Sequence, residues 1–588
     1  MANKKTLLGG VQLKVENMSG FDKSFYHALT APLGSIVPIC KQMLLPGSAE
    51  LRLKISATLP PLASDAFLRT HLKVEAFFQP FRNMYGGFQS WFSGEKVATL
   101  KTNQTPLGAL STAKLPRLNI ISTATDAQGA NIPTSRDAVN DVFGPHTLMD
   151  YFGVKEHLSG GNIILPWADP QISGYLNYSL FNIFPFICYQ QIYDQWYRNK
   201  LIERPLFAPS AVNIADLTSR STASNLPYCS FTSVRDFEVH LDQQNASQGA
   251  YGFRQTFYNV ALLNGHLLEL RQRNYGYDYF TTALPSAQDG APMAVDTSSG
   301  NFTISALRTA NVGQHWAEIN QVAGPDYVQT CEARYGKKPS SMVAQRPVLL
   351  GSADFPMFTS GVEQTAPFDI NSQQTGNPFE GLGARYGRAH AEGSDFVCKV
   401  DVDEPGYLMV MVSLVPEANY GQGIAHDMRI FTSFGGDSST DLPCHLLEGA
   451  GLEPVYAEEC GFDDSDTPNS LAGRAIFGYQ PRYMWHKAGN TNLVSGLFRS
   501  GGSLESFIPQ RVFTTQHQIN TNFLKVRSTD LDNVTAVSGA ISQYGVMIDS
   551  AIQLHIVEPL GESVMPSLSD PASEHGRSVY MSRGGQHV

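Results

Sequence analysis

Strict two-residue alternation in widely separated segments is the feature that most constrains how this chain folds. In residues 51–59 apolar side chains occupy every odd position, while Arg, Lys, Ser and Thr occupy the even ones. Because successive side chains of a strand point to opposite faces of a sheet, this pattern predicts a half-buried β-strand. Similar spacing predicts three further strands, at 71–78, 396–402 and 408–414. A Glu-Pro-Gly turn at 404–406 predicts that the last two pair as a hairpin.

A final strand is predicted at 545–557, where the apolar period slips near Ser550. Helical spacing occurs in fewer segments, namely 147–152, 177–198 and 303–321. Pro185 is expected to kink or start the second of these helices. Strands at both ends of the chain must therefore pair across a long middle to close one sheet. This order favours a Greek-key sandwich with long excursions over βαβ repeats.

The composition indicates a surface that is poor in charge. Charged residues make up 16% of the chain, against roughly 25% in an average soluble protein. Partners that cover much of the surface would explain this. The net charge is −11, yet residues 1–120 hold 14 Lys and Arg against 6 Asp and Glu. That basic segment predicts either a face that meets polyanions or ordinary solvated lysines on strand faces.

Residues of about 205–300 form a polar, turn-rich stretch that interrupts the apolar pattern. It is expected to be either a long insertion from a rigid scaffold or a small separate domain. The Ser-, Gly- and Pro-rich residues 560–588 are expected to form an extended arm. The seven cysteines include no CxxC pair and no secretory signal precedes them, so free thiols in a reducing compartment are expected. The longest uncharged run, 170–193, is too polar for a membrane span.

The search for catalytic motifs identifies no nucleotide-binding, metalloprotease or serine-hydrolase signature. Acidic residues cluster at 453–466, where a solvated loop is favoured over a calcium site. A carboxylate pair for glycoside hydrolysis stays open, because nothing in the sequence selects one. Aromatic residues cluster at 77–92, 275–280 and 477–485. Such clusters can stack nucleic-acid bases, but core or subunit-interface anchors are favoured.

Several segments, taken together and in order, resemble the major capsid protein of the Microviridae, the small icosahedral single-stranded DNA phages, and the gokushovirus-like branch in particular. These segments are HLKVEAFFQP at 71–80, YQQIYDQWYR at 189–198, DYFTTALP at 278–285, EPGY at 404–407 and FGYQPRY at 477–483. The resemblance does not extend to residues 205–270, 286–300 and 500–588.

The resemblance implies a mainly β fold, an eight-stranded antiparallel jelly roll with long loop insertions and a few helices. It implies a structural protein with no catalytic site and no cofactor. About sixty copies would form a closed icosahedral T=1 shell around a circular single-stranded DNA genome. The implied partners are a small basic DNA-binding protein, an internal scaffolding protein, a DNA pilot protein and a host surface receptor, with no membrane. The chain would belong to the virion capsid and to the host cytoplasm during assembly.

The resemblance also divides the chain. Residues 1–199 would hold an amino-terminal arm, the first strands and a helix, and 276–559 the remaining strands. Residues 200–275 would be an insertion that protrudes at the threefold axes and attaches to the host, and 560–588 a carboxy-terminal arm. The candidate DNA contacts are Lys4, Lys5, Lys14, Arg577 and Arg583. The candidate threefold contacts are Leu226, Tyr228, Phe231, Phe237 and Val239.

An alternative from another class is a monomeric β-sandwich that binds carbohydrate or hydrolyses glycosides. It predicts a carboxylate-lined cleft and a free monomer in solution.

Overall fold

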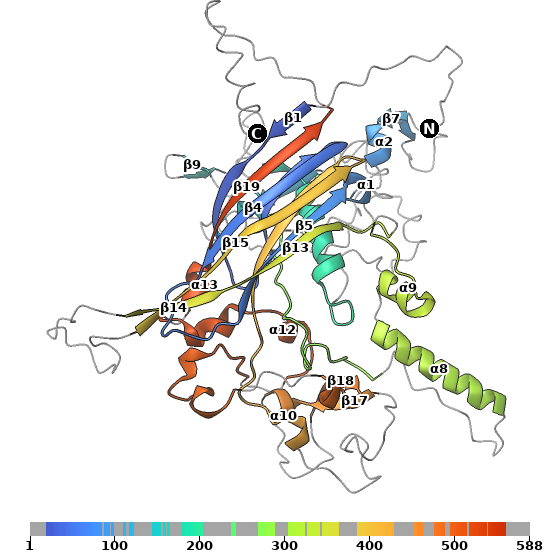
Figure 1. Cartoon of the computed structure of the whole chain (residues 1–588). Helices are drawn as coiled ribbons and strands as arrows, with labels where there is room; N and C mark the ends of the chain where they lie inside the picture. Colours follow the sequence, from blue (N-terminus) through green and yellow to red (C-terminus); the bar gives the residue numbers. More distant parts are fainter. Residues whose placement is uncertain are drawn as a thin grey trace, which may run out of the picture.

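The computed structural model describes the following residues: 19–84, 88–93, 144–154, 178–203, 268–287, 304–323, 326–341, 344–363, 385–428, 452–461, 475–488, 494–513, 517–537, 539–559 and the short strands 96–98, 110–112, 117–122, 157–159, 162–164 and 237–242. Two facing sheets dominate these residues, with helices and a second lobe beside them (Figure 1). No helix in the described ranges combines the length and apolar character needed to cross a bilayer.

The first sheet is built from segments at both ends of the chain. Its strands, in spatial order, are β1 (Ser19–Asp22) with β2 (Phe25–Ala31), β19 (Val546–Glu558), β4 (Gly47–Thr58), β15 (Arg385–Val402) and β14 (Phe358–Glu363). Every neighbouring pair is antiparallel. Strand β19 lies between β2 and β4, so that Ile552 is opposite Phe25 on one side and Leu53 on the other.

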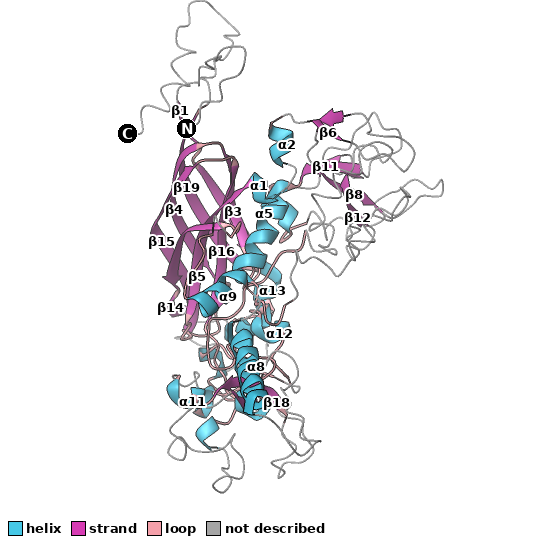
Figure 2. Cartoon of the chain, turned by 90° about the vertical axis from the view of Figure 1, so that its right-hand side faces the viewer, coloured by secondary structure: helices cyan, strands magenta, loops and turns pink. Residues whose placement is uncertain are grey.

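The second sheet has the spatial order β13 (Val348–Pro356), β5 (Thr70–Pro80), β16 (Gly406–Pro416) and β3 (Val37–Leu44), again antiparallel throughout. Figure 2 shows the two sheets edge-on, as two layers. The inward side chains of both sheets form one apolar core, which includes Leu51, Leu53, Leu72, Val74 and Leu554. Every residue of β16 is buried, because this strand is covered on both faces.

The chain crosses repeatedly between the two sheets, from β2 to β3, β4 and β5 and again from β15 to β16 and β19, which is the arrangement of a jelly roll. The order β2, β19, β4, β15 faces the order β13, β5, β16, β3, and within the described residues β1 and β14 extend the first sheet. The predicted fold class, a mainly β antiparallel jelly roll with a few helices, is confirmed.

The predicted hairpin across 404–406 is wrong. Strand β15 pairs with β4 and β14, whereas β16 pairs with β3 and β5, so the turn carries the chain from one sheet to the other. A Cβ on Gly406 would lie 2.4 Å from the carbonyl oxygen of Gln79, so β5 approaches too closely for any side chain there. Arg82 donates two hydrogen bonds to the Glu404 carboxylate, at 3.0 and 2.8 Å, and fixes the same turn.

The predicted slip in the last strand is also wrong, because inward and outward positions alternate without interruption along β19. Ser550 takes an inward position and is 1% exposed. Its hydroxyl donates a 2.8 Å hydrogen bond to the carbonyl of His27 on β2. A polar side chain therefore occupies a core position by satisfying its donor on the neighbouring strand.

The predicted helix at 177–198 begins later than expected. Residues Tyr178–Asn182 form strand β11, and helix α5 spans Phe184–Ile192, with Pro185 in its first turn and a π-turn at Tyr193–Tyr197 after it. Pro185 therefore starts the helix, as one of the two expectations stated. The Asn182 side chain accepts a 3.1 Å hydrogen bond from the backbone N–H of Phe184 at this start. Helices α4 (Leu148–Tyr151) and α8 (Ile304–Ala323) confirm the other two helical predictions.

A second lobe lies at the end of the sandwich where β14 is found (Figure 1). It contains the hairpin of β17 (Leu452–Tyr456) and β18 (Ile476–Pro481), with the short helices α10 (Ala457–Cys460), α11 (Met484–Lys487) and α12 (Thr521–Leu524). Its core is a separate apolar cluster formed by Tyr279, Phe280, Ala283, Tyr420, Val455, Cys460, Phe477, Ile519, Phe523 and Leu524. We call the elements around this cluster the lower lobe.

Candidate assembly surfaces

Most of the predicted contact residues lie outside the described residues: Lys4, Lys5, Lys14, Arg577, Arg583, Leu226, Tyr228 and Phe231. Phe237 and Val239 belong to strand β12 (Phe237–Asp242), which pairs with β8 (Arg117–Ser122). Strand β8 also pairs with β11, so the two residues lie in a small three-stranded sheet. Their role as threefold contacts stays a prediction.

The last residues of the predicted insertion contact the sandwich. The backbone N–H of Ile36 donates to the carbonyl of Arg271 at 2.8 Å. Arg273 forms a two-pronged ion pair with Glu75 of β5, at 2.7 and 2.8 Å. Residues 271–273 therefore pack against the sandwich. The boundaries of the insertion, 200–275, stay a prediction.

The acidic segment that begins at Glu453 is not a solvated loop in its described part. Glu453 is 4% exposed and accepts a 3.0 Å hydrogen bond from the backbone N–H of Tyr483. Glu459 accepts from the backbone N–H of Tyr456 at 3.1 Å, and its other oxygen lies 3.1 Å from Nδ1 of His426. Burial raises the pKa of Glu453 to about 7. The prediction of a solvated loop is wrong for these two carboxylates, because Tyr483 and His426 approach them from 30 and 33 residues away in the sequence.

The described residues contain no group of three or more His, Cys, Asp or Glu side chains placed to hold a metal ion. Asp463, Asp464 and Asp466 of the acidic segment lie outside them. A calcium site at 453–466 therefore stays the less favoured alternative that the sequence allows.

Cys460 and His517 form a close pair in the lower lobe, with Sγ 3.0 Å from Nε2. Burial raises the pKa of this thiol far above its usual range, so it stays protonated and is a poor nucleophile. The imidazole of His517 is stacked on Phe513, with ring centroids 4.0 Å apart. The Cys460–His517 pair therefore contributes to the packing of the lobe and does not have the properties of a catalytic dyad.

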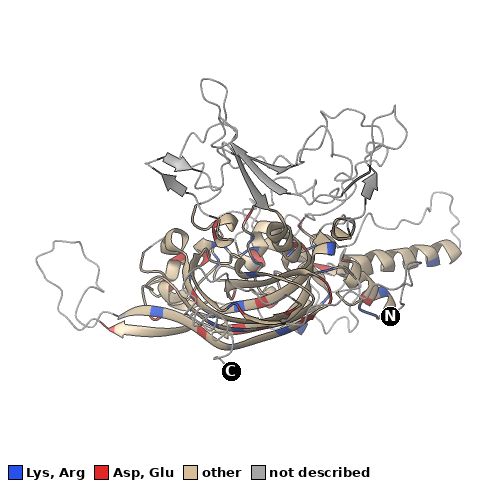
Figure 3. Ribbon diagram, turned by 90° about the horizontal axis from the view of Figure 1, so that it is seen from above, with Lys and Arg blue, Asp and Glu red and all other residues tan. Residues whose placement is uncertain are grey.

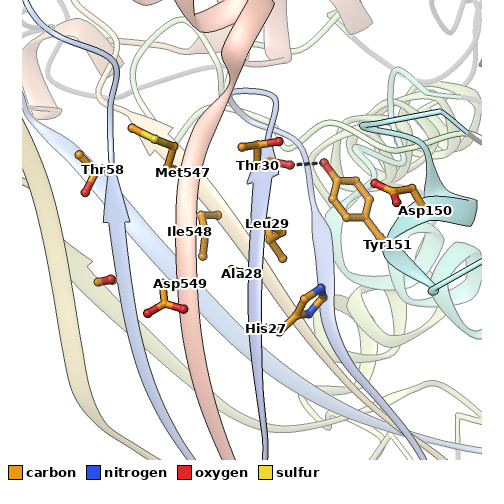
Figure 4. A pocket seen from close by; sticks show the side chains of 11 residues that line it. His27, Ala28, Leu29, Thr30, Thr58, Asp150, Tyr151, Met547, Ile548 and Asp549 are labelled. Carbon is orange, nitrogen blue, oxygen red and sulfur yellow. Dashed lines mark hydrogen bonds between the residues drawn. The ribbon is translucent and has the colours of Figure 1, made fainter. Parts of the chain in front are cut away.

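Two surface hollows have volumes in the range of ligand sites. One, of about 590 Å³, lies over β2, β19 and β4 beside α4, and Tyr151 at its rim donates a 2.6 Å hydrogen bond to the carbonyl of Thr30 (Figure 4). Its two carboxylates, Asp150 and Asp549, lie on opposite sides of the view and do not point toward one another. The hollow therefore lacks a converging pair of acids for hydrolysis.

The other hollow, of about 690 Å³, is bordered by His71, Lys73, Asp354 and Glu417 together with residues 276–279. Asp354 is bound by both basic residues, at 2.9 Å to His71 and 3.5 Å to Lys73. Glu417 lies 3.8 Å from the other nitrogen of His71. Asp354 and Glu417 are thus both close to His71. The Asp278 carboxylate accepts hydrogen bonds from the Tyr420 hydroxyl and from the backbone N–H groups of Phe280 and Thr281.

Many rings of the aromatic clusters pack inside the molecule, as favoured from the sequence, whereas Trp91, Phe92 and Tyr277 are 39%, 68% and 96% exposed. Phe77 contacts Trp196 and Tyr197, and Phe81 stacks on Phe88. Phe477 belongs to the core of the lower lobe. These rings are therefore occupied by neighbouring side chains rather than presented to bases.

Large apolar side chains nevertheless remain on the exterior. They include Tyr26 at one sheet edge, Phe358 and Val362 on β14, Met428, and a group on helices α8 and α9 (Tyr327–Tyr335). Lys, Arg, Asp and Glu are thinly scattered over the body between them (Figure 3). Exposed aromatic and aliphatic side chains with little charge are typical of surfaces that become subunit interfaces.

The sequence predicted α8 but not its exposed face. The spacing at 303–321 predicted a helix without stating which of its faces is buried, and apolar side chains of a surface helix usually face the core. The signal that could have raised the question is the row of small residues on its other side, since small side chains permit close contact with a neighbouring helix.

Double-sheet jelly rolls occur in viral capsid proteins, lectins and cupins, and large exposed apolar surfaces with little charge favour the capsid class, whose copies cover one another. A family model described as "Capsid protein (F protein)" matches residues 170–568, more than half of the chain, and the chain belongs to this family. The resemblance to the Microviridae major capsid protein is thereby confirmed.

Three relatives carry the name "Capsid protein VP1". The Chlamydia phage 1 protein is 28% identical over 48% of this chain and 46% of its own length. The protein of Bdellovibrio phage phiMH2K is 21% identical over 86% of this chain and 87% of its own length. The Spiroplasma virus 4 protein is 22% identical over 47% of this chain, and the match spans 46% of that protein. These are structural capsid proteins, and the chain is accordingly a virion protein and not an enzyme.

Proposed function

We propose that this chain assembles with about sixty copies of itself into a closed icosahedral T=1 shell around a circular single-stranded DNA genome. The observation that carries the proposal is a jelly roll of a capsid family whose exterior retains large apolar side chains. A closed shell gives each copy several neighbours, and each neighbour can cover one of these surfaces.

Energetics support assembly through several contacts. A stable contact between proteins buries roughly 800 Å² on each partner. A charge content of 16% lowers the cost of removing such surfaces from water, because few ions must lose their hydration. Shell formation through several moderate contacts therefore suits this composition.

The genome contacts are proposed for the chain ends. Lys4, Lys5, Lys14, Arg577 and Arg583 would neutralise phosphates, while the body of the chain carries the negative charge. A small basic DNA-binding protein would then lie between shell and genome. Assembly in the host cytoplasm would further involve an internal scaffolding protein and a DNA pilot protein.

The insertion at 200–275 is proposed to form threefold protrusions and to attach to a host surface receptor. Its polar, turn-rich composition suits a surface segment that varies with its partner. Leu226, Tyr228, Phe231, Phe237 and Val239 would meet their counterparts from the two other copies at the axis.

Electron microscopy and sedimentation of the expressed chain, with and without its phage partners, test the assembly proposal. Spherical particles of uniform size with icosahedral symmetry and about sixty copies are expected. A chain that stays monomeric in every such preparation, or a shell of different symmetry, would contradict it. In a density map, amino termini on the outer surface would contradict the proposed DNA contacts alone.

A further inference from the structure

Helix α8 buries and exposes the opposite kinds of side chain from an ordinary surface helix. Its small or polar residues Ala317 and Gln321 are buried, at 5% and 7% exposed. On the opposite side of the helix, the large apolar residues Ile304, Val312 and Val322 are 69%, 69% and 60% exposed. A surface helix normally buries its apolar stripe against its own core and presents polar side chains to water. The apolar stripe of α8 is therefore left for another surface.

The helix is held in place at its root. Asp326, at the start of α9, pairs with Lys200 at 2.6 Å and with Arg346 at 3.4 Å, and all three side chains are largely buried. The Arg346 guanidinium also lies 5.0 Å from the ring centroid of Trp196, so this cluster fastens α9 to the body. Arg334 of α9 in turn lies over the ring of Trp316 on α8, at 5.1 Å.

From that root α8 projects outward as an arm. Figures 1 and 3 both show it extending away from the sheets. Residues 304–309, its first six, are all exposed. A helix with so little cover from its own chain is of marginal stability in water, since tertiary packing supplies most helical stability. The direction of the arm is thus fixed by its root, while the exposed apolar side chains of the arm are left without packing against the described residues.

The charge of the arm favours protein over nucleic acid as the occupant. Residues 304–323 carry one Arg and one Glu, Arg308 and Glu318. Single-stranded DNA is bound by positively charged grooves that follow its backbone, which this nearly neutral helix does not provide. A neutral apolar stripe also creates no repulsion between identical subunits.

We propose that the outward face of α8 docks on a neighbouring copy of this chain and acts as a clamp between subunits of the shell. The inference rests on the proposed assembly and adds the surface that carries part of it. Twenty residues of helix span about 30 Å and about 10 Å in width, so α8 covers about 300 Å². That is less than half of the roughly 800 Å² that a stable contact needs on each partner, so the clamp is one part of a larger interface.

The first test places charge on the stripe. The pair of substitutions Ile304→Asp and Val312→Asp changes two exposed side chains on one side of the helix, so the free subunit should fold and melt as the wild type does. Particle yield should fall by about tenfold or more, because two carboxylates would be buried without partners. The matched control is Gln329→Asp with Gln553→Asp, which adds the same charge at exposed polar positions of α9 and β19 and should leave the yield within about twofold.

The outcomes separate the two proposals. If the wild-type chain forms no shells, the proposed function fails. If wild type and the Ile304→Asp, Val312→Asp variant form shells equally well, only the clamp is overturned. If the variant forms shells that lack DNA, α8 binds nucleic acid and the clamp is likewise overturned. A variant that is already misfolded as a free subunit would contradict the exposure on which the clamp depends.

Hydrogen exchange of the unmodified chain gives a readout that requires no substitution. The amides of residues 304–312 should exchange quickly in free subunits and about a hundredfold more slowly in particles, since docking would prevent local opening. Equal exchange in both states would overturn the clamp even if particles form.

Discussion

The sandwich and the lower lobe differ in what fills their interiors. In the sandwich, the inward positions of β4 and β19 hold Leu51, Leu53, Ile55, Ile552 and Leu554. In the lower lobe, one of the largest fully buried side chains is a guanidinium, that of Arg511, which is 2% exposed. Its Nη2 donates to the carbonyl of Phe523, and its Nη1 donates to the hydroxyl of Tyr420 at 3.3 Å.

That difference shows two routes to a packed interior in one chain. The sandwich gains its stability from apolar area removed from water, which depends little on salt or pH. In the lower lobe the Arg511 guanidinium lies 4.3 Å from the ring of Phe523 and 4.4 Å from that of Tyr275, a residue of the sandwich core, and its polar partners must all be satisfied. The lobe should therefore respond far more sharply to loss of a single partner and to pH.

The largest effect is expected from Arg511→Met. It removes the charge while keeping much of the volume, and it leaves the Phe523 carbonyl and the Tyr420 hydroxyl without their donor. The free energy of unfolding should fall by about 3 to 5 kcal/mol, measured by urea denaturation. Arg388→Met, at an exposed position of β15, is the control and should cause little change. A loss below about 1 kcal/mol would show that the guanidinium is not essential to the lobe.

Leu554→Ala tests the sandwich in the same assay. Leu554 is fully buried on β19, and its truncation should lower the free energy of unfolding by about 3 kcal/mol through lost burial and a cavity. Gln553→Ala, one position along on the outward face, is the control. Amide exchange should rise in β2 and β4 and stay unchanged in β17 and β18. Equal acceleration in the lobe would contradict the separation of the two cores.

A smaller effect is expected from pH, through Glu453. Because the pKa of this buried carboxyl is raised to about 7, the folded lobe holds its proton over a range where the unfolded chain releases it. Stability should then fall by about 2 kcal/mol as the pH rises from 5.5 to 7, at up to 1.4 kcal/mol for each unit. Glu453→Gln should remove this slope. A slope that is unchanged in the Gln variant would assign the pH dependence to other groups.

The smallest effect is expected from the partly exposed ion pair of Arg82 and Glu404 on the sandwich. Their side chains are 32% and 27% exposed, so solvent screens the pair. A double-mutant cycle with Arg82→Gln and Glu404→Gln should give a coupling of about 0.5 to 1 kcal/mol. A coupling as large as the Arg511 effect would remove the contrast between buried and surface charge.

The sequence was informative wherever a local rule decided the structure. Alternation at 51–59 and 71–78 located β4 and β5, and helical spacing at 303–321 located α8. In each case the period of the apolar side chains is a property of neighbouring residues, which any single sequence displays. The fold class followed from these elements together with the ordered motifs shared with a known family.

The failures occurred where a distant partner decided the outcome. The strands on either side of 404–406 are adjacent in sequence, yet β16 pairs with residues 37–44 and 70–80 instead. The buried carboxylate of Glu453 accepts a hydrogen bond from the backbone N–H of Tyr483, which lies 30 residues further along the chain. Whether the apolar stripe of α8 faces the core or the exterior likewise depends on tertiary packing, and the periodicity is the same in both cases.

The position of β19 has a consequence for the time at which the molecule can fold. This strand is the centre of its sheet between β2 and β4, and Ser550 bonds to His27, 523 residues earlier. A ribosome delivers the chain at about 5 to 20 residues each second, so the inward leucines of β4 wait tens of seconds for their partner. During synthesis the first sheet therefore lacks β19, and its unpaired strand edges and apolar surface are exposed. Folding of the sandwich is completed only after translation has passed residue 558, which makes the nascent chain dependent on protection from aggregation until that moment.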